Sequence, residues 1–234
     1  MKKHFGSILA AALCLIVTNG CLASDVLFHK VSRDYDQRGV LGKTYRREFE
    51  TRMFTQPTWH QRLYYESHDP DVNETFEIYS RPDGSRWLSH RRASPSLSRI
   101  IWNRIFNGER FDLTKELNTA RITGREVALP SELAKELELL WKTMLPGLAE
   151  APIPRDLYVH TPIFIGFVRE NNSVKTGSVS IASYNTPIYR AFVDIITDLR
   201  TIADRNSDSS ESILAGLPSK VRSVRIRLQV KGRS

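Results

Sequence analysis

The sequence predicts an α+β fold in which antiparallel sheet strands have two main amphipathic helices packed on them. The first helix is predicted over residues 129–145, where Leu133, Leu137 and Trp141 recur at helical spacing. The second is predicted over residues 187–203, which show the same periodicity. The strands are predicted from alternating apolar and polar residues between turn-forming sequences, a pattern typical of antiparallel hairpins.

Both ends of the first helix are set by local sequence. Pro130 suits a first helical position because its missing N–H costs no hydrogen bond there. Pro146 and Gly147 favour a helix end, since one lacks a donor and the other accepts a left-handed turn. Trp141 and Met144 fall on the apolar side, so we expect both in the core.

The first 23 residues have the pattern of a secretory signal peptide. Lys2 and Lys3 precede an uncharged apolar run over residues 8–17, and Cys21 and Ala23 provide the small side chains expected before cleavage after Ala23. The run is shorter than the about 20 residues of a membrane-spanning helix. We therefore expect a periplasmic or secreted protein with no transmembrane segment in the mature chain.

An alternative for the same segment is a lipoprotein signal. Cys21 follows Gly20, as in a lipobox, and would then be acylated and anchored. Thr18 and Asn19 are poor matches to the residues that such a signal needs before them. Acylation of Cys21 is therefore our second interpretation.

Composition limits the chemistry of the mature chain. Both cysteines, Cys14 and Cys21, lie in the leader, which excludes disulfides and thiol catalysis. Residues 24–234 suffice for a single α+β domain, and a seam between two units would fall near residues 146–155. The net charge of +8 permits an anionic partner. For an exported chain we expect a protein or an anionic envelope component, and no nucleic acid.

The elements before the first helix are predicted from local patterns. Strands are expected over residues 43–49, 60–67, 74–80, 86–90 and 122–127, and a short helix over residues 97–106. The strongest β signal before residue 100 is the hairpin joined by Arg81-Pro82-Asp83-Gly84-Ser85, where proline fixes one backbone angle and glycine accepts a positive one.

A second hairpin and a final strand are predicted after the first helix. The hairpin covers residues 157–168 and 173–183 with a turn at Asn171-Asn172, and Thr186 is the expected cap of the following helix. Residues 206–211 should form a loop and residues 212–217 a single turn. Residues 224–230 alternate apolar and basic side chains, which predicts a strand.

The chain contains no familiar catalytic or cofactor motif. Its histidines share no metal-ligand spacing, and it has neither a nucleophile elbow nor a glycine-rich phosphate loop. We therefore predict neither a metal nor another cofactor. An active site assembled only by folding stays open as an alternative, with His60, His68, Asp69 or His160 as its members.

A basic and aromatic stretch is the candidate partner-binding site. Arginine and tryptophan are good interface anchors because a planar cation and a large ring bind carboxylates and flat surfaces with little loss of entropy. The alternative is a salt-bridged surface beside a core tryptophan, with Glu48, Glu66, Glu74 and Glu77 as partners. The candidate residues are Arg86, Trp87, His90, Arg91, Arg92, Arg99, Trp102 and Arg104.

Part of the chain resembles a group of small uncharacterised exported bacterial proteins with a Trp-and-Met helix before a hairpin. The resemblance covers residues 129–203 and depends on LWKTML at residues 140–145, on residues 156–159 and 177–180, and on the final amphipathic helix. The usual tryptophan and proline of the second hairpin strand are replaced by Val179-Ser180-Ile181. The resemblance implies no activity.

These observations favour a non-enzymatic exported binding protein, for example an inhibitor or an immunity protein against a cell-envelope toxin. The first alternative is an envelope-acting hydrolase whose site is assembled by folding. The second is a lipoprotein-type structural protein of the envelope, anchored through Cys21.

Overall fold

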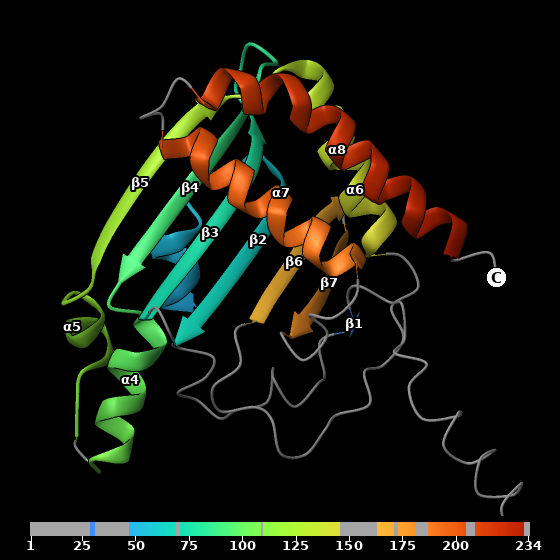
Figure 1. Cartoon of the computed structure of the whole chain (residues 1–234). Helices are drawn as coiled ribbons and strands as arrows, with labels where there is room; N and C mark the ends of the chain where they lie inside the picture. Colours follow the sequence, from blue (N-terminus) through green and yellow to red (C-terminus); the bar gives the residue numbers. More distant parts are fainter. Residues whose placement is uncertain are drawn as a thin grey trace, which may run out of the picture.

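A single antiparallel sheet forms the centre of the fold. The computed structural model describes residues 29–30, 47–68, 71–108, 110–145, 163–170, 173–180, 187–204 and 209–231. Its seven strands lie in the order β1-β7-β6-β2-β3-β4-β5, and every neighbouring pair is antiparallel. Helices pack on this sheet, which confirms the predicted α+β class (Figure 1).

From β2 to α7 the elements follow the predicted order, except for the short helix α5, which was not predicted. The strands are β1 (His29–Lys30), β2 (Trp59–His68), β3 (Asp71–Ser80), β4 (Arg86–Ser94), β5 (Arg121–Ala128), β6 (Ile163–Glu170) and β7 (Ser173–Ser180). The helices are α4 (Leu97–Phe106), α5 (Leu113–Leu117), α6 (Ser131–Met144), α7 (Pro187–Asp204) and α8 (Ser209–Lys231). Residues 47–53 form a further helical segment.

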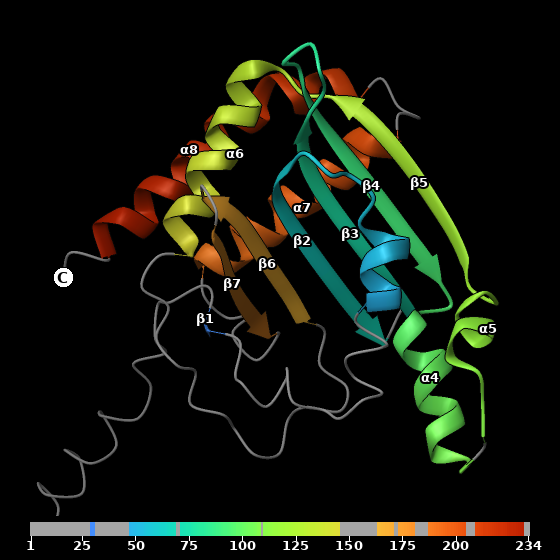
Figure 2. The same ribbon diagram turned by 180° about the vertical axis from the view of Figure 1, so that it is seen from behind.

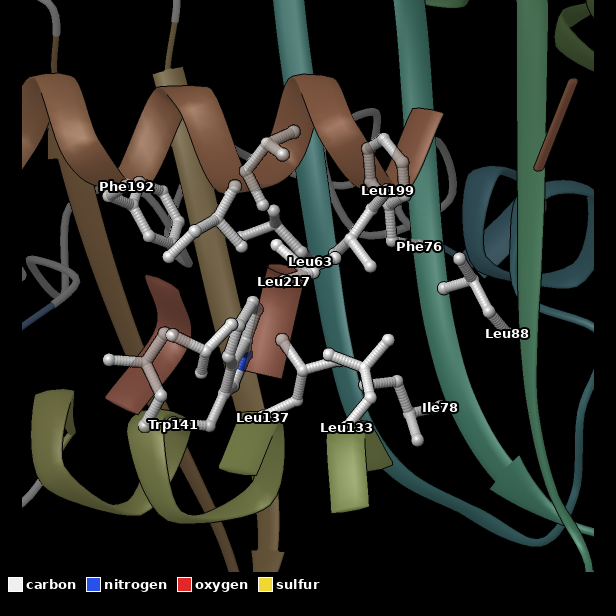
Figure 3. Close-up of a cluster of buried hydrophobic side chains, with 14 of the residues drawn as sticks. Leu63, Phe76, Ile78, Leu88, Leu133, Leu137, Trp141, Phe192, Leu199 and Leu217 are labelled. Carbon is white, nitrogen blue, oxygen red and sulfur yellow. The ribbon is translucent and has the colours of Figure 1, made fainter. Parts of the chain in front are cut away.

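One face of the sheet, which we call the helical face, is covered by α6, α7 and α8. Helix α7 crosses the strands, and α8 packs against both α6 and α7 (Figure 1). Leu63, Phe76 and Leu88 from the sheet meet Phe192 and Leu199 from α7 in the larger of the two hydrophobic clusters (Figure 3). Burying such side chains is the main favourable contribution to folding, at about 1.5–3 kcal/mol each.

The opposite face, which we call the rear face, is covered by residues 47–53, while α4 and α5 lie at one end of the sheet and contribute to the same cluster (Figure 2). Phe49 and Met53 lie one helical turn apart and pack with Tyr64, Leu97 and Ile101 in a second cluster. Because both faces are covered, the middle strands are buried on both sides.

The predicted helix over residues 129–145 is confirmed as α6, although it begins at Ser131, and Pro130 is its N-cap rather than its first residue. Leu133, Leu137, Leu140, Trp141 and Met144 are all buried, so the expected core positions of the tryptophan and the methionine are confirmed. The ring of Trp141 lies 6.0 Å from the ring of Phe192 in α7. This contact joins the two predicted helices through the core.

The prediction of a final strand is wrong. Residues 224–230 belong to α8, which also includes the residues predicted as a turn over 212–217 and the end of the loop predicted over 206–211. The buried residues Leu217, Val221 and Val224 and the half-buried Leu228 follow helical spacing. Pro218 lies inside the helix, where it has no N–H to donate to the preceding turn.

The strand predicted over residues 43–49 is also wrong for its described part. Residues 47–53 are helical, and Phe49 and Met53 are buried on the same side of that helix. The alternation that suggested a strand ends before Met53, whose spacing from Phe49 is the helical signal. Residues 43–46 lie outside the described residues.

The remaining predicted elements are present. The hairpin of β3 and β4, helix α4, strand β5, the antiparallel pair of β6 and β7 and helix α7 all form where local patterns placed them. Residues 157–162, 171–172, 181–183 and 186 lie outside the described residues. None of the described helices has the length and apolar character needed to cross a membrane.

Candidate functional site

Strand β5 forms one edge of the sheet along its full length. All eight of its residues pair with β4, from Arg121 opposite Ser94 to Ala128 opposite Trp87. Among the described residues no strand pairs with its other side. Most β5 side chains are exposed, and only Val127 is buried. An open strand of this length can pair with another chain.

The ladder between β4 and β5 fixes which backbone groups point outward. The N–H of Leu129 donates to the carbonyl of Arg86 at 2.9 Å, directly after the paired strand. Hydrogen-bonded pairs alternate along an antiparallel ladder without a bulge, so Val127, Arg125 and the other odd residues bond to β4. The N–H and C=O groups of Ile122, Gly124, Glu126 and Ala128 therefore face the open edge.

Three arginines lie beside this edge on the helical face. Arg121 and Arg125 are exposed residues of β5. Arg92 of β4 lies opposite Thr123, and 47% of its side chain is exposed. Within the described residues the guanidinium of Arg121 has no hydrogen-bond or ion-pair partner. Arg125 donates to the carbonyl of Asp204 at 2.6 Å, where α7 ends. Both guanidiniums keep donors for an external carboxylate.

A fourth arginine lies over β5 on the rear face. Arg91 pairs with Gly124, and its Nε would lie 3.1 Å from a Cβ atom added to that glycine. Its Nη1 donates to the carbonyl of Arg52 at 2.6 Å, which orients the side chain. The missing side chain at Gly124 therefore leaves room for Arg91, which lies over the rear face of β5 at this residue.

The carboxylates near the edge offset this charge only in part. Glu126 accepts hydrogen bonds from Tyr79 at 2.7 Å and from Arg81 at 3.0 Å, so its charge is compensated within the fold. Asp204, the last residue of α7, is exposed and lies beside Arg125. Over the half of β5 that begins at Arg121, the surface on the helical face is cationic.

The strand register divides the predicted basic and aromatic site between two faces. Arg86, His90 and Arg92 belong to the helical face, whereas Trp87 and Arg91 belong to the rear face. His90 is buried and stacks on Phe76 with 4.7 Å between the ring centroids, so it is not available to a partner. Arg92 and Arg91 lie beside the open edge of β5. The sequence did not suggest Arg121 and Arg125 as members of the site, because only the pairing of β5 with β4 brings these two residues close to Arg91 and Arg92.

The other predicted site residues lie away from this edge or have partners within the fold. Trp87 is half-buried, with the guanidinium of Arg81 over its ring at 3.3 Å. Arg104 of α4 pairs with Glu116 at 3.1 Å, and Arg99 is exposed on the same helix. The side chain of Trp102 lies outside the described part of the chain, as does Cys21.

Comparisons of the chain with protein-family models, curated proteins and solved structures found no match. The resemblance of residues 129–203 to exported proteins therefore stays a prediction.

A second polar cluster lies near α6, at the end of the sheet where β2 and β4 begin and β3 ends. His60 Nε2 lies 2.7 Å from the hydroxyl of Ser80, and the guanidinium of Arg86 contacts both groups. Burial, and next the charge of Arg86, lowers the pKa of His60. A neutral imidazole beside a serine hydroxyl resembles half of a catalytic triad, but the adjacent cation would oppose the imidazolium that forms when serine attacks.

The remaining members of the alternative active site are not among the side chains that the structure describes. The side chain of His68, and all of Asp69 and His160, lie outside the described part of the chain. Within that part, no group of three histidine, cysteine or acidic side chains is placed to hold a metal ion.

A buried carboxylate on the helical face joins α7 to the sheet. Arg200 of α7 donates to Glu74 Oε2 through Nε at 2.9 Å and Nη2 at 2.6 Å. His90 Nε2 and Arg92 Nε each lie 3.8 Å from the carboxylate, too far for a hydrogen bond but close enough to stabilise its charge. Burial alone would raise the pKa of Glu74, yet His90 and Arg200 together lower it.

Proposed function

We propose that this protein is an exported, non-enzymatic binding protein whose partner is another protein. The single observation that supports this proposal most is the open edge of β5, an eight-residue strand lined by arginines and largely exposed. A long open edge invites aggregation, which native proteins prevent with short or bulged edge strands or with charged side chains. Here the edge is long, regular and cationic, which suits a surface kept for an anionic protein partner.

Within this class, an inhibitor or an immunity protein against a cell-envelope toxin is the specific role that we propose. Such proteins act by covering a partner's surface, and a preformed strand loses little entropy on binding. Binding is also favoured over catalysis because two carboxylates that could act as an acid or a base, Glu74 and Glu126, are held in ion pairs within the fold.

The test is to co-express the chain with the products of adjacent reading frames and measure complex formation by size-exclusion chromatography and calorimetry. We expect a stable complex that the double substitution Arg121→Glu and Arg125→Glu weakens by about tenfold or more, because charge reversal repels an anionic partner. The matched control is Lys135→Glu with Arg190→Glu, two exposed cations on α6 and α7.

The proposal fails if none of these products forms a complex and none becomes less toxic in the periplasm when the chain is co-expressed. It also fails in its choice of surface if the control pair weakens the complex as much as the β5 pair does.

A hydrolase is the second candidate function, and the contact between His60 and Ser80 favours it. The direct test is labelling of the purified protein with a fluorophosphonate, which reacts with activated serine nucleophiles. Labelling that disappears in Ser80→Ala would support a hydrolase. Lack of labelling in the unchanged protein would remove Ser80 as a nucleophile.

A further inference from the structure

We infer that the partner contributes an extended, acidic segment that pairs with β5 and adds a strand to the sheet. This inference deepens the proposed function and rests on it. It concerns the chemistry of the partner, which must offer both main-chain hydrogen bonds and carboxylates in a fixed order.

The backbone of β5 supports the first half of the inference. Ile122, Gly124, Glu126 and Ala128 direct their N–H and C=O groups to the open side. The middle of this row is Gly124, which has no side chain of its own, and the side chain of Arg91 lies over its rear face rather than beyond the open edge. An added strand would therefore find donors and acceptors at every second residue.

The arginines on the helical face support the second half. Arg121 and Arg125 are about 14 Å apart along the strand, because each residue advances the chain by about 3.4 Å. Arg92 lies between them, opposite Thr123, and 47% of its side chain is exposed although its Nε lies 3.8 Å from Glu74 Oε1. The three cations are thus spaced by about two residues each. Carboxylates at alternate positions of an added strand would meet them on one face.

The rear face of β5 requires a different residue type. Ile122 is half-buried there and packs against the rear cluster, while Glu126 occupies the other end. Acidic side chains on this face of the added strand would approach Glu126, and apolar ones would extend the contact of Ile122. The inferred segment therefore alternates acidic and apolar residues.

A second copy of this chain fits the same edge poorly. Pairing of two β5 strands about Gly124 would put Arg121 and Arg125 of both copies on one face of a single sheet. Like charges on neighbouring strands are unfavourable, so charge complementarity selects an acidic segment instead.

The experiment uses the purified protein and a labelled peptide, Glu-Val-Glu-Val-Glu-Val-Glu, with its lysine counterpart as the charge control. We expect the acidic peptide alone to bind and to slow amide exchange at Ile122, Gly124, Glu126 and Ala128. Gly124→Pro should weaken binding by about tenfold, since proline removes an outward N–H without breaking a bond to β4. Gly124→Ala keeps that N–H, but its Cβ would lie 3.1 Å from Arg91 Nε and make that side chain shift, so it should weaken binding much less than Gly124→Pro does.

Three results would overturn the inference. One is equal binding of the acidic and lysine peptides. Another is displacement of the acidic peptide by inorganic polyphosphate, if polyphosphate also binds the unchanged protein and the Gly124→Pro variant equally well. That result would indicate a simple anion site. The third is an unchanged exchange rate at the outward amides, in the peptide complex or in a complex with a natural partner. In that last case the proposed function would stand, whereas the absence of any natural partner would contradict the function itself.

Discussion

Two buried glutamates of β3, Glu74 and Glu77, have pKa values that are shifted in opposite directions by their different surroundings. Glu74 faces α7 and has Arg200, His90 and Arg92 around it, which lowers its pKa. Glu77 faces the rear and is held by Arg62 at 2.8 Å and the Thr55 N–H at 2.9 Å. There burial outweighs these partners and raises the pKa of Glu77. The sequence predicted glutamate partners for the arginines, but not which faces they occupy.

Arg200→Met should destabilise the protein by about 2–3 kcal/mol at neutral pH, because it removes charged hydrogen bonds from a buried carboxylate. Glu74 has a lowered pKa when folded, so its contribution is present above its ordinary value of 4.5 and is lost as the pH falls through the folded value. The difference in the free energy of unfolding between the variant and the unchanged protein, measured with urea, should be smaller at about pH 3.5 than at neutral pH. An equal difference at both pH values would contradict this account.

His60 should titrate below the ordinary histidine value of 6.5 when followed by NMR, since burial and then Arg86 lower its pKa. Arg86→Gln should raise the midpoint in part, because burial, the larger cause, is retained. Lys135→Gln, on an exposed position of α6, is the control that should leave the midpoint unchanged.

At the scale of the element, local patterns predicted what local interactions determine. The hairpin of β3 and β4 has its turn in the sequence, and Gly84 adopts the positive φ of 81° that the turn requires. Helices α6 and α7 display their apolar sides at regular spacing. Helix α8 was missed because its apolar residues near the end also fit an alternating pattern. The choice between helix and strand depends on contacts with α6, which are distant in sequence. Glu136 of α6 forms ion pairs with Arg222 at 2.9 Å and with Arg225 at 3.2 Å.

Substitutions in α8 distinguish the helix from the strand that the sequence suggested. Val221→Ala should cost about 1–2 kcal/mol, because Val221 is fully buried. Ile226→Ala should change stability by less than about 0.5 kcal/mol, because Ile226 is 48% exposed. In a strand Ile226 would share the buried face of Val224 and Leu228, so a large loss at Ile226 in thermal or urea unfolding would contradict the helix.

At the scale of the whole molecule, the order of the strands could not be predicted. Strand β2 pairs with β6 although the two are far apart in sequence. Both strands are apolar on both faces, with Leu63 and Tyr64 on β2 and Phe164 and Ile165 on β6, so neither shows which neighbour it needs. The candidate site depends on this order, because it leaves β5 at the edge and brings Arg121 and Arg125 beside Arg92.

Neutralising the edge should make the molecule associate with itself. The double substitution Arg121→Thr and Arg125→Thr removes two charges that keep an open strand from pairing with another copy. We expect a larger species than the unchanged protein in size-exclusion chromatography with light scattering. Lys135→Thr with Arg190→Thr removes the same charge elsewhere and should elute as the unchanged protein does. Equal elution of all three would show that these arginines do not guard the edge.

The position of α7 and α8 at the end of the chain also determines when the molecule can fold. Strands β2, β3 and β4 are synthesised long before these helices, so Leu63, Phe76 and Leu88 have only α6 to help cover them on the helical face until α7 and α8 emerge. Strand β2 likewise waits for β6. Sheets built from such distant pairings fold slowly and late. For a chain that we propose to be exported, this delay is useful, because an incomplete chain cannot become a compact body too wide to be threaded through a membrane channel.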